Sequence, residues 1–577
     1  MIYLENIIWL LLFLSLHLSD KYFPISQWIF YGALLLISLS LLFKKNIRIN
    51  KSASIAIAGL LFLSLIIRIL FQGNIYGTYA IYLLLAYWLV FFIWIVQFNE
   101  NKSNIKTIAG IIIVTVVIEI VWGFGQLFGF IENNNEYFLL GGSFGNPNAY
   151  SGFLSVISPL ILSLLLTYRR KKKAENLYYF LMGCLLLIAF LLVISKSRGA
   201  WIAAGLGCLL VTNNYFLLTD KLKNILHTPT RRIIATVCAL MIVSIAGYSL
   251  YQLKARSADG RLLVWKIVNQ TPSSFVGNGI GCVEANYGKW QAAYFASGKG
   301  TDAERYVADY VTCAYNDFME MGIDQGRGIT VIFVFVLYFA FRQRSKVTSS
   351  LFIGAKASLT AITVWMLVSY PLAIPAIYLY FIFCLAVVFH EKKNCISWKG
   401  AKWCIPVFGL LIALMGGYML YGYFQLRKGQ ELVFTGQLDK GIETYRKAEP
   451  ILKNNGLFYF YYGSALFQKQ EYQNSTEKLE IAVNKSSDPN IFTLLGNDYK
   501  ELGQLDKAKE NYLVAINMIP SRLYSKYLLT QLLIESHEYE AAEKWANEIL
   551  NTKEKMPTTA AKEIKEEMKT FLKDRNY

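Results

Sequence analysis

Residues 77–97 read GTYAIYLLLAYWLVFFIWIVQ, a run of 21 positions without a charged side chain. A helix that rises about 1.5 Å per residue needs about 20 apolar residues to cross the hydrocarbon core of a bilayer. Further apolar runs lie at 53–71, where Arg68 is the only charged residue, and at 233–250. Across the 577 residues only 17% are charged, against about 25% in soluble globular chains. The composition therefore predicts a polytopic membrane protein.

Hydropathy predicts about thirteen membrane-spanning helices, the first of which we prefer to a signal peptide because no small-residue cleavage site follows it. We expect the spans at 4–19, 27–43, 53–72, 77–97, 107–129, 151–168, 177–194, 199–218, 233–251, 326–341, 350–370, 373–389 and 403–424.

The charges on the connecting loops predict the orientation. Every second loop, beginning with 44–51, is basic, and these six loops carry 22 Lys and Arg residues. The short loops on the opposite side carry three, which are Lys21, Lys196 and Arg198. Basic residues near span ends resist translocation, so the N-terminus is expected in the cytoplasm and the C-terminal region outside it. The net charge of +18 thus reflects topology, and we expect no nucleic-acid partner.

A second domain is expected over 425–577, after a membrane domain over 1–424. Here the sequence repeats every 33–34 residues or so, and the clearest copy is DPNIFTLLGNDYKELGQLDKAKENYLVAINMIP at 488–520. Its Gly496, Tyr499, Ala508 and Tyr512 match the tetratricopeptide pattern, in which small residues let two helices approach. The fold class predicted is therefore all-α, a membrane helix bundle followed by an α-solenoid that either binds a protein partner or only stabilises the chain.

Three segments that are not apolar spans fall on the predicted outer face. GGSFGNPNAYSG at 141–152 combines turn residues with a helix start, which Asn148 or Ser151 is expected to cap. SKSRG at 195–199 places Arg198 at the membrane boundary, where it reaches either lipid headgroups or a diphosphate. The long loop 252–325 contains DGRLLVWKIVNQTPSSFVGNGIGC and, further on, CAYNDFMEMGIDQG.

Four motifs follow one another along these segments, namely FGNPN-x-x-x-G, SRGAW, R-x-x-x-W…P…G-x-G and YNDFMEMG. In this order they resemble the motifs of the O-antigen ligase superfamily, which also holds O-antigen polymerases and protein O-oligosaccharyltransferases. The resemblance covers roughly residues 50–390. It implies metal-independent transfer of a glycan from undecaprenyl diphosphate to a hydroxyl of lipid A core, a protein or another glycan, without a cofactor. It also implies a bacterial inner-membrane location with the repeats in the periplasm.

The resemblance assigns Arg198 and Arg261 to the donor diphosphate, and Arg68 in the third span is a third candidate. Further candidates from the quoted motifs for the loop and backbone of the site are, in chain order, Asn146, Asn148, Gly277, Gly279 and Asn316.

The family's proposed catalytic histidine falls on Tyr315, a poor base because a phenol ionises near pH 10. If 303–322 is a helix, Asp309, Cys313, Asp317 and Glu320 share one face, and its carboxylates are either candidate bases or a solvated surface.

Two further polar groups lie among the predicted spans. His17 is a weaker candidate for the catalytic base, and Glu119 is either functional or part of a structural polar pair.

Cys282 and Cys313 are the cysteines of the external loop, and we expect them to form a disulfide across about 30 residues. No cluster with metal-ligand spacing accompanies them, so no metal site is predicted.

Two other function classes compete with the transferase. The absent histidine would fit a non-catalytic scaffold of a polysaccharide assembly complex, although a scaffold has no need for diphosphate-binding arginines. A transporter is less well supported, because paired broken helices and an inverted repeat are not evident.

Overall fold

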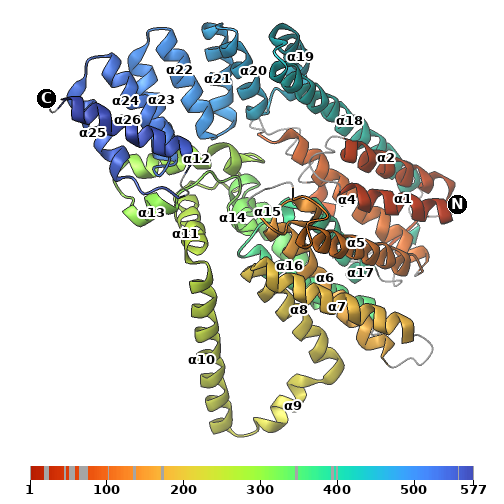
Figure 1. Cartoon of the computed structure of the whole chain (residues 1–577). Coiled ribbons are helices and arrows are strands. Elements are labelled where there is room, and N and C mark those ends of the chain that lie inside the picture. The colour runs from red at the N-terminus through yellow and green to blue at the C-terminus, as the bar shows by residue number, and fades with distance from the viewer. Residues whose placement is uncertain are drawn as a thin grey trace.

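The computed structural model is almost entirely helical (Figure 1). It describes residues 2–17, 25–44, 47–50, 59–63, 76–101, 103–133, 138–169, 175–344, 349–390, 395–397, 400–555 and 558–575. Within this part of the chain, β1 (Arg48–Asn50) and β2 (Cys395–Ser397) form a short antiparallel pair, with Ile49 opposite Ile396. The predicted all-helical class is thus confirmed apart from these two strands.

Most apolar helices gather in one bundle. They are α1 (Ile2–Ser15), α2 (Ile25–Ser40), α4 (Thr78–Glu100), α5 (Ser103–Leu127), α6 (Pro147–Tyr168), α7 (Glu175–Ser195), α8 (Arg198–Phe216), α15 (Arg327–Arg342), α16 (Ser350–Met366), α17 (Pro375–Phe389) and the first part of α18 (Ala401–Phe434). Short 3-10 turns lie at Leu41–Phe43, Gly142–Phe144 and Pro371–Ala373.

Six helices among the described residues are long and apolar enough to cross a membrane. They are Ile25–Phe43, Thr78–Glu100, Ser103–Leu127, Pro147–Tyr168, Glu175–Ser195 and Ala401–Phe434. Shorter apolar helices occupy Tyr3–Ser15, Ser350–Met366 and Pro375–Phe389. The count of thirteen spans stays a prediction, and most of the span expected at 53–72, including Arg68, lies outside the described residues.

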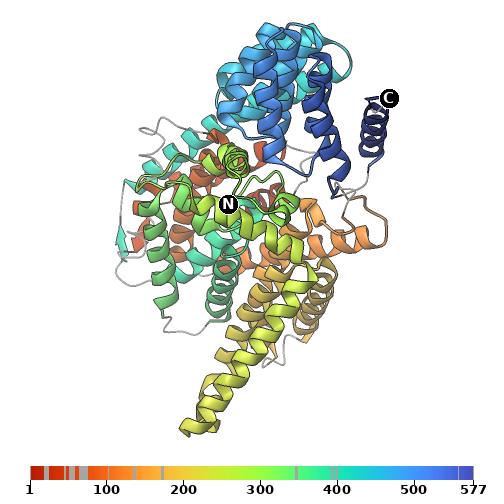
Figure 2. The same cartoon turned by 90° about the vertical axis from the view of Figure 1, so that its left-hand side faces the viewer.

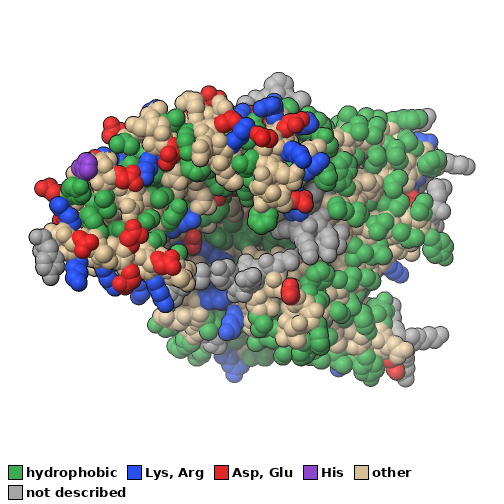
Figure 3. Space-filling model, turned by 45° about the horizontal axis from the view of Figure 1, so that its top comes forward, with side chains coloured by type: hydrophobic (Ala, Val, Ile, Leu, Met, Phe, Trp, Pro, Cys, Tyr) green, Lys and Arg blue, Asp and Glu red, His purple; other side chains and the backbone are tan. Residues whose placement is uncertain are grey.

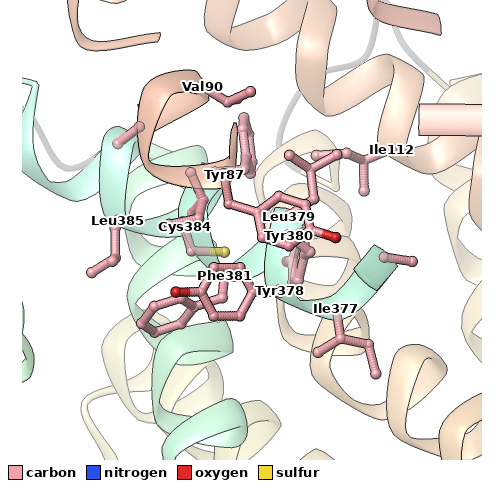
Figure 4. Close-up of a cluster of buried hydrophobic side chains, with 14 of the residues drawn as sticks. Tyr87, Val90, Ile112, Ile377, Tyr378, Leu379, Tyr380, Phe381, Cys384 and Leu385 are labelled. Atoms are coloured by element: carbon pink, nitrogen blue, oxygen red, sulfur yellow. The ribbon is translucent and has the colours of Figure 1, made fainter. Parts of the chain in front are cut away.

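Helix α17 lies at the centre of the bundle. Its sequence, PAIYLYFIFCLAVVF, is apolar on every face, and every residue after Ile377 is buried. A helix that is hydrophobic all round has to be surrounded by other helices or by lipid. Figure 4 shows the contact with α4, where the rings of Tyr87 and Tyr378 lie 4.8 Å apart between their centroids.

Helices α9 (Leu218–Ile225) and α10 (Pro229–Leu253) form an arm that projects from the bundle (Figures 1 and 2). The arm exposes large apolar side chains along α10, including Ile233, Val237, Leu240 and Ile245. An exposed apolar surface of this length suits contact with lipid.

The external loop folds into a small helical unit with its own core. It comprises α11 (Ala255–Asn269), α12 (Cys282–Ala296), α13 (Asp302–Val307) and α14 (Asp317–Asp324). Leu263, Ile267, Val283 and Phe295 are among its buried residues.

The prediction of one helix over 303–322 is wrong. Two short helices replace it, because Thr301 caps the start of α13 and Asn316 caps the start of α14 through their side-chain oxygens. Between them residues 308–316 are not helical, and Tyr315 has a positive φ of 50°. Asp309 and Cys313 therefore do not share a helix face with Glu320.

The C-terminal residues form stacked helices, which we call the C-terminal array. They are α19 (Leu438–Leu452), α20 (Gly456–Gln468), α21 (Tyr472–Lys485), α22 (Pro489–Glu501), α23 (Leu505–Met518), α24 (Leu523–Glu535), α25 (Tyr539–Asn551) and α26 (Thr559–Arg575). Successive helices pack side by side, as Figures 1 and 2 show. Helix α18 enters the array from the bundle without a break, so the boundary expected at 424/425 falls inside a continuous helix.

Candidate functional site

A cavity of about 840 Å³ opens where the bundle, the external loop and the C-terminal array meet. Its walls come from the starts of α6 and α8, the end of α10, α11, the 306–315 segment and residues 368–370, with Lys555 from the array. Figure 3 shows that this side of the molecule is hollowed between the array and the bundle, with Lys and Arg side chains beside the hollow.

The cavity brings together six of the residues singled out in the sequence. These are Asn146, Asn148, Arg198, Arg261, Asp309 and Tyr315. They come from four segments that are far apart in the chain, so their convergence reflects the tertiary fold. The other described candidates, Gly277, Gly279, Asn316, Asp317, Glu320, Cys282 and Cys313, are not among the lining residues.

The cavity has a surplus of positive charge. Its cationic lining residues are Lys196, Arg198, Lys254, Arg256, Arg261 and Lys555. Asp309 is the carboxylate among the described lining residues, and its Oδ2 pairs with Lys555 Nζ at 2.9 Å. Burial and the nearby cations Arg198, Lys196 and Arg261 lower the pKa of Lys254. Uncompensated cations in a partly enclosed space favour an anionic ligand.

Arg198 is held by the end of helix α10. Its guanidinium donates to the carbonyl oxygens of Leu250 (2.6 Å), Tyr251 (3.1 Å) and Lys254 (3.1 Å). A cation at a helix C-terminus satisfies the last carbonyls and interacts favourably with the helix dipole. Arg198 thus fixes the C-terminal end of α10 at the cavity.

Arg261, on α11, is anchored at the opposite wall. It donates to the Val368 carbonyl oxygen, and its guanidinium carbon lies 5.2 Å from the centroid of the Tyr315 ring. The Tyr315 ring in turn meets the Tyr370 ring edge-on, with centroids 5.7 Å apart. These contacts fix the guanidinium at the cavity wall.

Tyr315 is a support for Arg261 and is unsuited to remove a proton. Burial raises the pKa of its phenol well above 10, so the neutral form dominates at physiological pH. Trp265 Nε1 donates to the Ala314 carbonyl oxygen at 3.0 Å, which holds this part of the loop in place.

The 141–148 segment closes the cavity from the bundle side. Asn146, and not the expected Asn148 or Ser151, caps α6, because Pro147 starts the helix and the Asn146 side chain accepts from the backbone N–H groups of 148 and 149. Asn148 Nδ2 instead donates to Ser369 Oγ at 2.9 Å. Asn148 Oδ1 accepts from Ser197 Oγ at 3.1 Å, so one side chain joins three segments of the wall.

Asp317 and Glu320 hold backbone rather than face the cavity. Asp317 Oδ2 accepts from the Leu372 N–H at 3.1 Å, and Glu320 Oε2 accepts from the Ala314 N–H at 2.8 Å. Burial raises the pKa of Glu320 to about 7 and that of Asp317 well above its ordinary value. Of the three carboxylates considered from sequence, Asp309 is therefore the one that lines the cavity.

Gly277, Gly279 and Asn316 shape α14. Gly277 and Gly279 have φ values of 88° and 115°, and the Gly279 N–H donates to the Asp324 carbonyl oxygen at 3.0 Å. A Cβ on Gly277 would lie 2.5 Å from backbone atoms of Gln325, so a side chain does not fit there. Asn316 caps α14 and donates from Nδ2 to the Leu367 carbonyl oxygen at 3.1 Å.

The disulfide expected between Cys282 and Cys313 is not formed. Both cysteines are buried free thiols, Cys282 at the start of α12 and Cys313 in the 308–316 segment. Asn286 Nδ2 lies 3.5 Å from Cys282 Sγ. Burial raises the pKa of Cys282 to about 11, and it raises that of Cys313 further. Two cysteines in one loop do not by themselves establish the geometry that a disulfide needs.

His17 and Glu119 form a buried pair inside the bundle. His17 Nδ1 lies 2.8 Å from Glu119 Oε1, and Glu119 Oε2 accepts from the Ser143 N–H at 3.1 Å. The pair therefore satisfies a buried charge and holds the start of the 141–148 segment. His17 is not among the residues that line the cavity.

Four of the six cations were missed as site residues. Lys196 adjoins Arg198, and Lys254 and Arg256 follow the predicted span 233–251 directly, so a count of basic residues at the start of the long loop could have found them. Lys555 gives no such signal, because it lies in a charged stretch nearly 300 residues away along the chain.

Comparisons with protein-family models and with curated proteins find no match to this chain. The fold and the site therefore define the protein only as a class, a helical membrane protein with a basic cavity between its bundle and a C-terminal helical array.

Proposed function

We propose that the protein transfers a glycan from undecaprenyl diphosphate to an acceptor hydroxyl, as its resemblance to the O-antigen ligase superfamily implies. The observation that carries the proposal is the surplus of cations in a cavity that also unites the FGNPN, SRG, Arg261 and Tyr315 motif positions. A diphosphate is the anion that such a site would hold, and it is also the leaving group of the transfer. The acceptor is lipid A core, a protein or another glycan.

In the proposed reaction the Arg261 guanidinium and the Lys254 ammonium stabilise the diphosphate as it leaves. The bond between the sugar's anomeric carbon and the phosphate oxygen breaks, and the electron pair departs with the diphosphate. The acceptor oxygen forms the new bond, and its proton passes to the Asp309 carboxylate. Fixed cations that face developing negative charge are an effective way to lower such a barrier.

The proposal includes a cellular setting. The transferase resides in a bacterial inner membrane with the cavity and the array on the periplasmic face. The array is a tetratricopeptide-type solenoid that recruits a protein, which is either an acceptor or a partner. The stacked helix pairs and the repeat period of the sequence support this assignment.

The test is a transfer assay in membranes that carry a labelled undecaprenyl-diphosphate oligosaccharide, with each acceptor class added in turn. We expect transfer by the wild type and a loss of about 100-fold or more for Arg261→Ala. Arg446→Ala, an exposed arginine on α19, is the matched control and should keep wild-type activity. A wild type that binds the donor but transfers to no acceptor would favour the scaffold and overturn the proposal.

A further inference from the structure

Lys555 connects the C-terminal array to the cavity. It lies in the segment between α25 and α26, and its ammonium group donates to the Ala308 carbonyl oxygen at 2.6 Å and to Asp309 Oδ2 at 2.9 Å. A third, longer contact reaches the Val307 carbonyl oxygen at 3.5 Å. One side chain thus holds the backbone just before Asp309 and the carboxylate of Asp309, the only acidic residue among the described lining residues.

The array fixes the position of Lys555. Lys565 donates to the Thr552 carbonyl oxygen at 3.0 Å and pairs with Glu554 at 2.9 Å. Lys526, which is almost fully buried, donates to Thr552 Oγ1 at 3.0 Å. The segment before Lys555 is therefore tied to α24 and α26 on both sides.

The array is in turn docked on helix α12 of the external loop. The Gly288 N–H donates to Ser487 Oγ at 3.0 Å, and Lys289 Nζ donates to the Val483 carbonyl oxygen at 2.7 Å. Gln291 Nε2 reaches the Met518 carbonyl oxygen at 2.5 Å. A small apolar core seals this junction, formed by Ala292, Phe492, Ala515, Met518 and Ile519. These hydrogen bonds thus hold the array against the loop. The position of Lys555 beside Asp309 is a consequence of that docking.

The ion pair between Lys555 and Asp309 affects the charge balance of the cavity. Lys254 and Arg256 line the same cavity, and a carboxylate that paired with either of them would offset its positive charge. A fixed ammonium from the array keeps Asp309 at one place on the wall. The remaining cations then stay available for an anionic ligand.

We infer that Lys555 is a positioning residue for Asp309 and that the C-terminal array thereby completes the transfer site. This inference rests on the proposed function, in which Asp309 takes the proton of the acceptor hydroxyl. It assigns the array a second task beside recruitment, because without it Asp309 would lack its anchor.

A double-mutant cycle tests the inference in the full-length protein. Transfer is measured in the same assay for Lys555→Met, Asp309→Asn and the combined variant, with Lys555→Arg as the conservative replacement. We expect Lys555→Met to lower kcat about tenfold while KM for the donor changes less than about twofold. The combined variant should be no slower than Asp309→Asn, because Lys555 acts through that carboxylate. Lys555→Arg should recover most of the activity.

Lys569→Met is the matched control, since Lys569 forms an exposed ion pair with Glu566 on α26 and is not among the residues that line the cavity. It should leave kcat unchanged. Thermal unfolding of each variant identifies any loss that comes from the fold alone.

The outcomes separate the two proposals. If the wild type transfers and Lys555→Met keeps its kcat, the inference is overturned while the transferase stands. The same holds if the losses from Lys555→Met and Asp309→Asn multiply in the combined variant. If the wild type transfers to no acceptor, the proposed function itself fails, and the role of Lys555 fails with it.

Discussion

The cations that line the cavity and the carboxylates held inside the external loop differ in what they bind. Asp317, Glu320 and Asp324 each accept from backbone N–H groups and are held inside the fold. Lys254 and Arg256 instead line an open cavity beside other cations. Carboxylates that accept hydrogen bonds from the backbone hold the structure around the site in place. Cations without a carboxylate partner determine what the site can bind.

The largest effect should come from removing two cavity cations together. In Lys254→Ala/Arg261→Ala we expect transfer, measured as kcat/KM for the donor, to fall about 1,000-fold or more, because each cation faces the same leaving diphosphate. The pair Arg446→Ala/Lys569→Ala removes the same two residue types from exposed array positions and should have little effect. Equal losses in the two pairs would show that net charge matters and position does not.

Substitution of a buried carboxylate should lower the free energy of unfolding. Asp324 accepts from the Gly281 N–H at 2.7 Å and from the Val283 N–H at 3.0 Å. Asp324→Ala leaves two donors without partners, and we expect a loss of about 2–5 kcal/mol in unfolding free energy. Denaturant unfolding in detergent measures it. The folded fraction should transfer at near wild-type kcat, and a specific loss of kcat would place Asp324 with the cavity residues.

The stability of the external loop should also depend on pH. Burial raises the pKa of Glu320 from 4.5 to about 7, so the folded state holds this proton more tightly than the unfolded chain does. The stabilisation is fully present below about pH 4.5 and is lost as the pH rises through about 7. The melting temperature should therefore fall between pH 5 and pH 8. Glu320→Gln, which keeps an acceptor for Ala314, should make that fall smaller, and an unchanged slope would contradict the assignment.

Tyr315 should contribute to transfer through the contact of its aromatic ring with Arg261. Tyr315→Ala removes the surface under Arg261, and we expect kcat/KM to fall about fivefold, in line with the ~1 kcal/mol of a cation–π contact. Tyr315→Phe keeps the ring and should cost less than about threefold. A much greater loss for Tyr315→Phe would mean that the hydroxyl takes part in the reaction.

The smallest effect concerns the two loop cysteines. Mass spectrometry of unreduced protein should find both Cys282 and Cys313 as free thiols, and reducing agents should not change the melting temperature. A peptide cross-linked through these residues would contradict the structure.

Sequence patterns predicted the helices far better than their contacts. The apolar runs located α4, α5 and α6 within a few residues, because length and hydropathy alone determine whether a helix can span a bilayer. The motif order also singled out Arg198, Arg261 and the Tyr315 position, and all three line one cavity. Asp309 lines it too, although it became a candidate through a helix over 303–322 that the structure does not have.

The sequence-based predictions failed where contacts between distant segments determine the structure. The helix over 303–322 follows from residue spacing, but the cap at Asn316 starts a new helix there. Glu119 was recognised as a buried charge, whereas its partner His17 lies 102 residues away, so no local pattern reveals the pair. Lys555 was missed for the same reason, since only the docking of the array brings it to Asp309.

The continuous helix α18 gives the molecule a fixed internal length. Its 34 residues correspond to about 51 Å. About 30 Å of this length separates Gly409, which packs against Ser38 in the bundle, from Gly429, which packs against Tyr445 in the array. One inserted residue would turn the array by about 100° and move it by about 1.5 Å along the helix relative to the bundle. Even four inserted residues, which leave the angle only about 40° off, would move it by about 6 Å and carry Lys555 out of reach of Asp309. The helix therefore sets both the rotation and the distance of the array relative to the bundle.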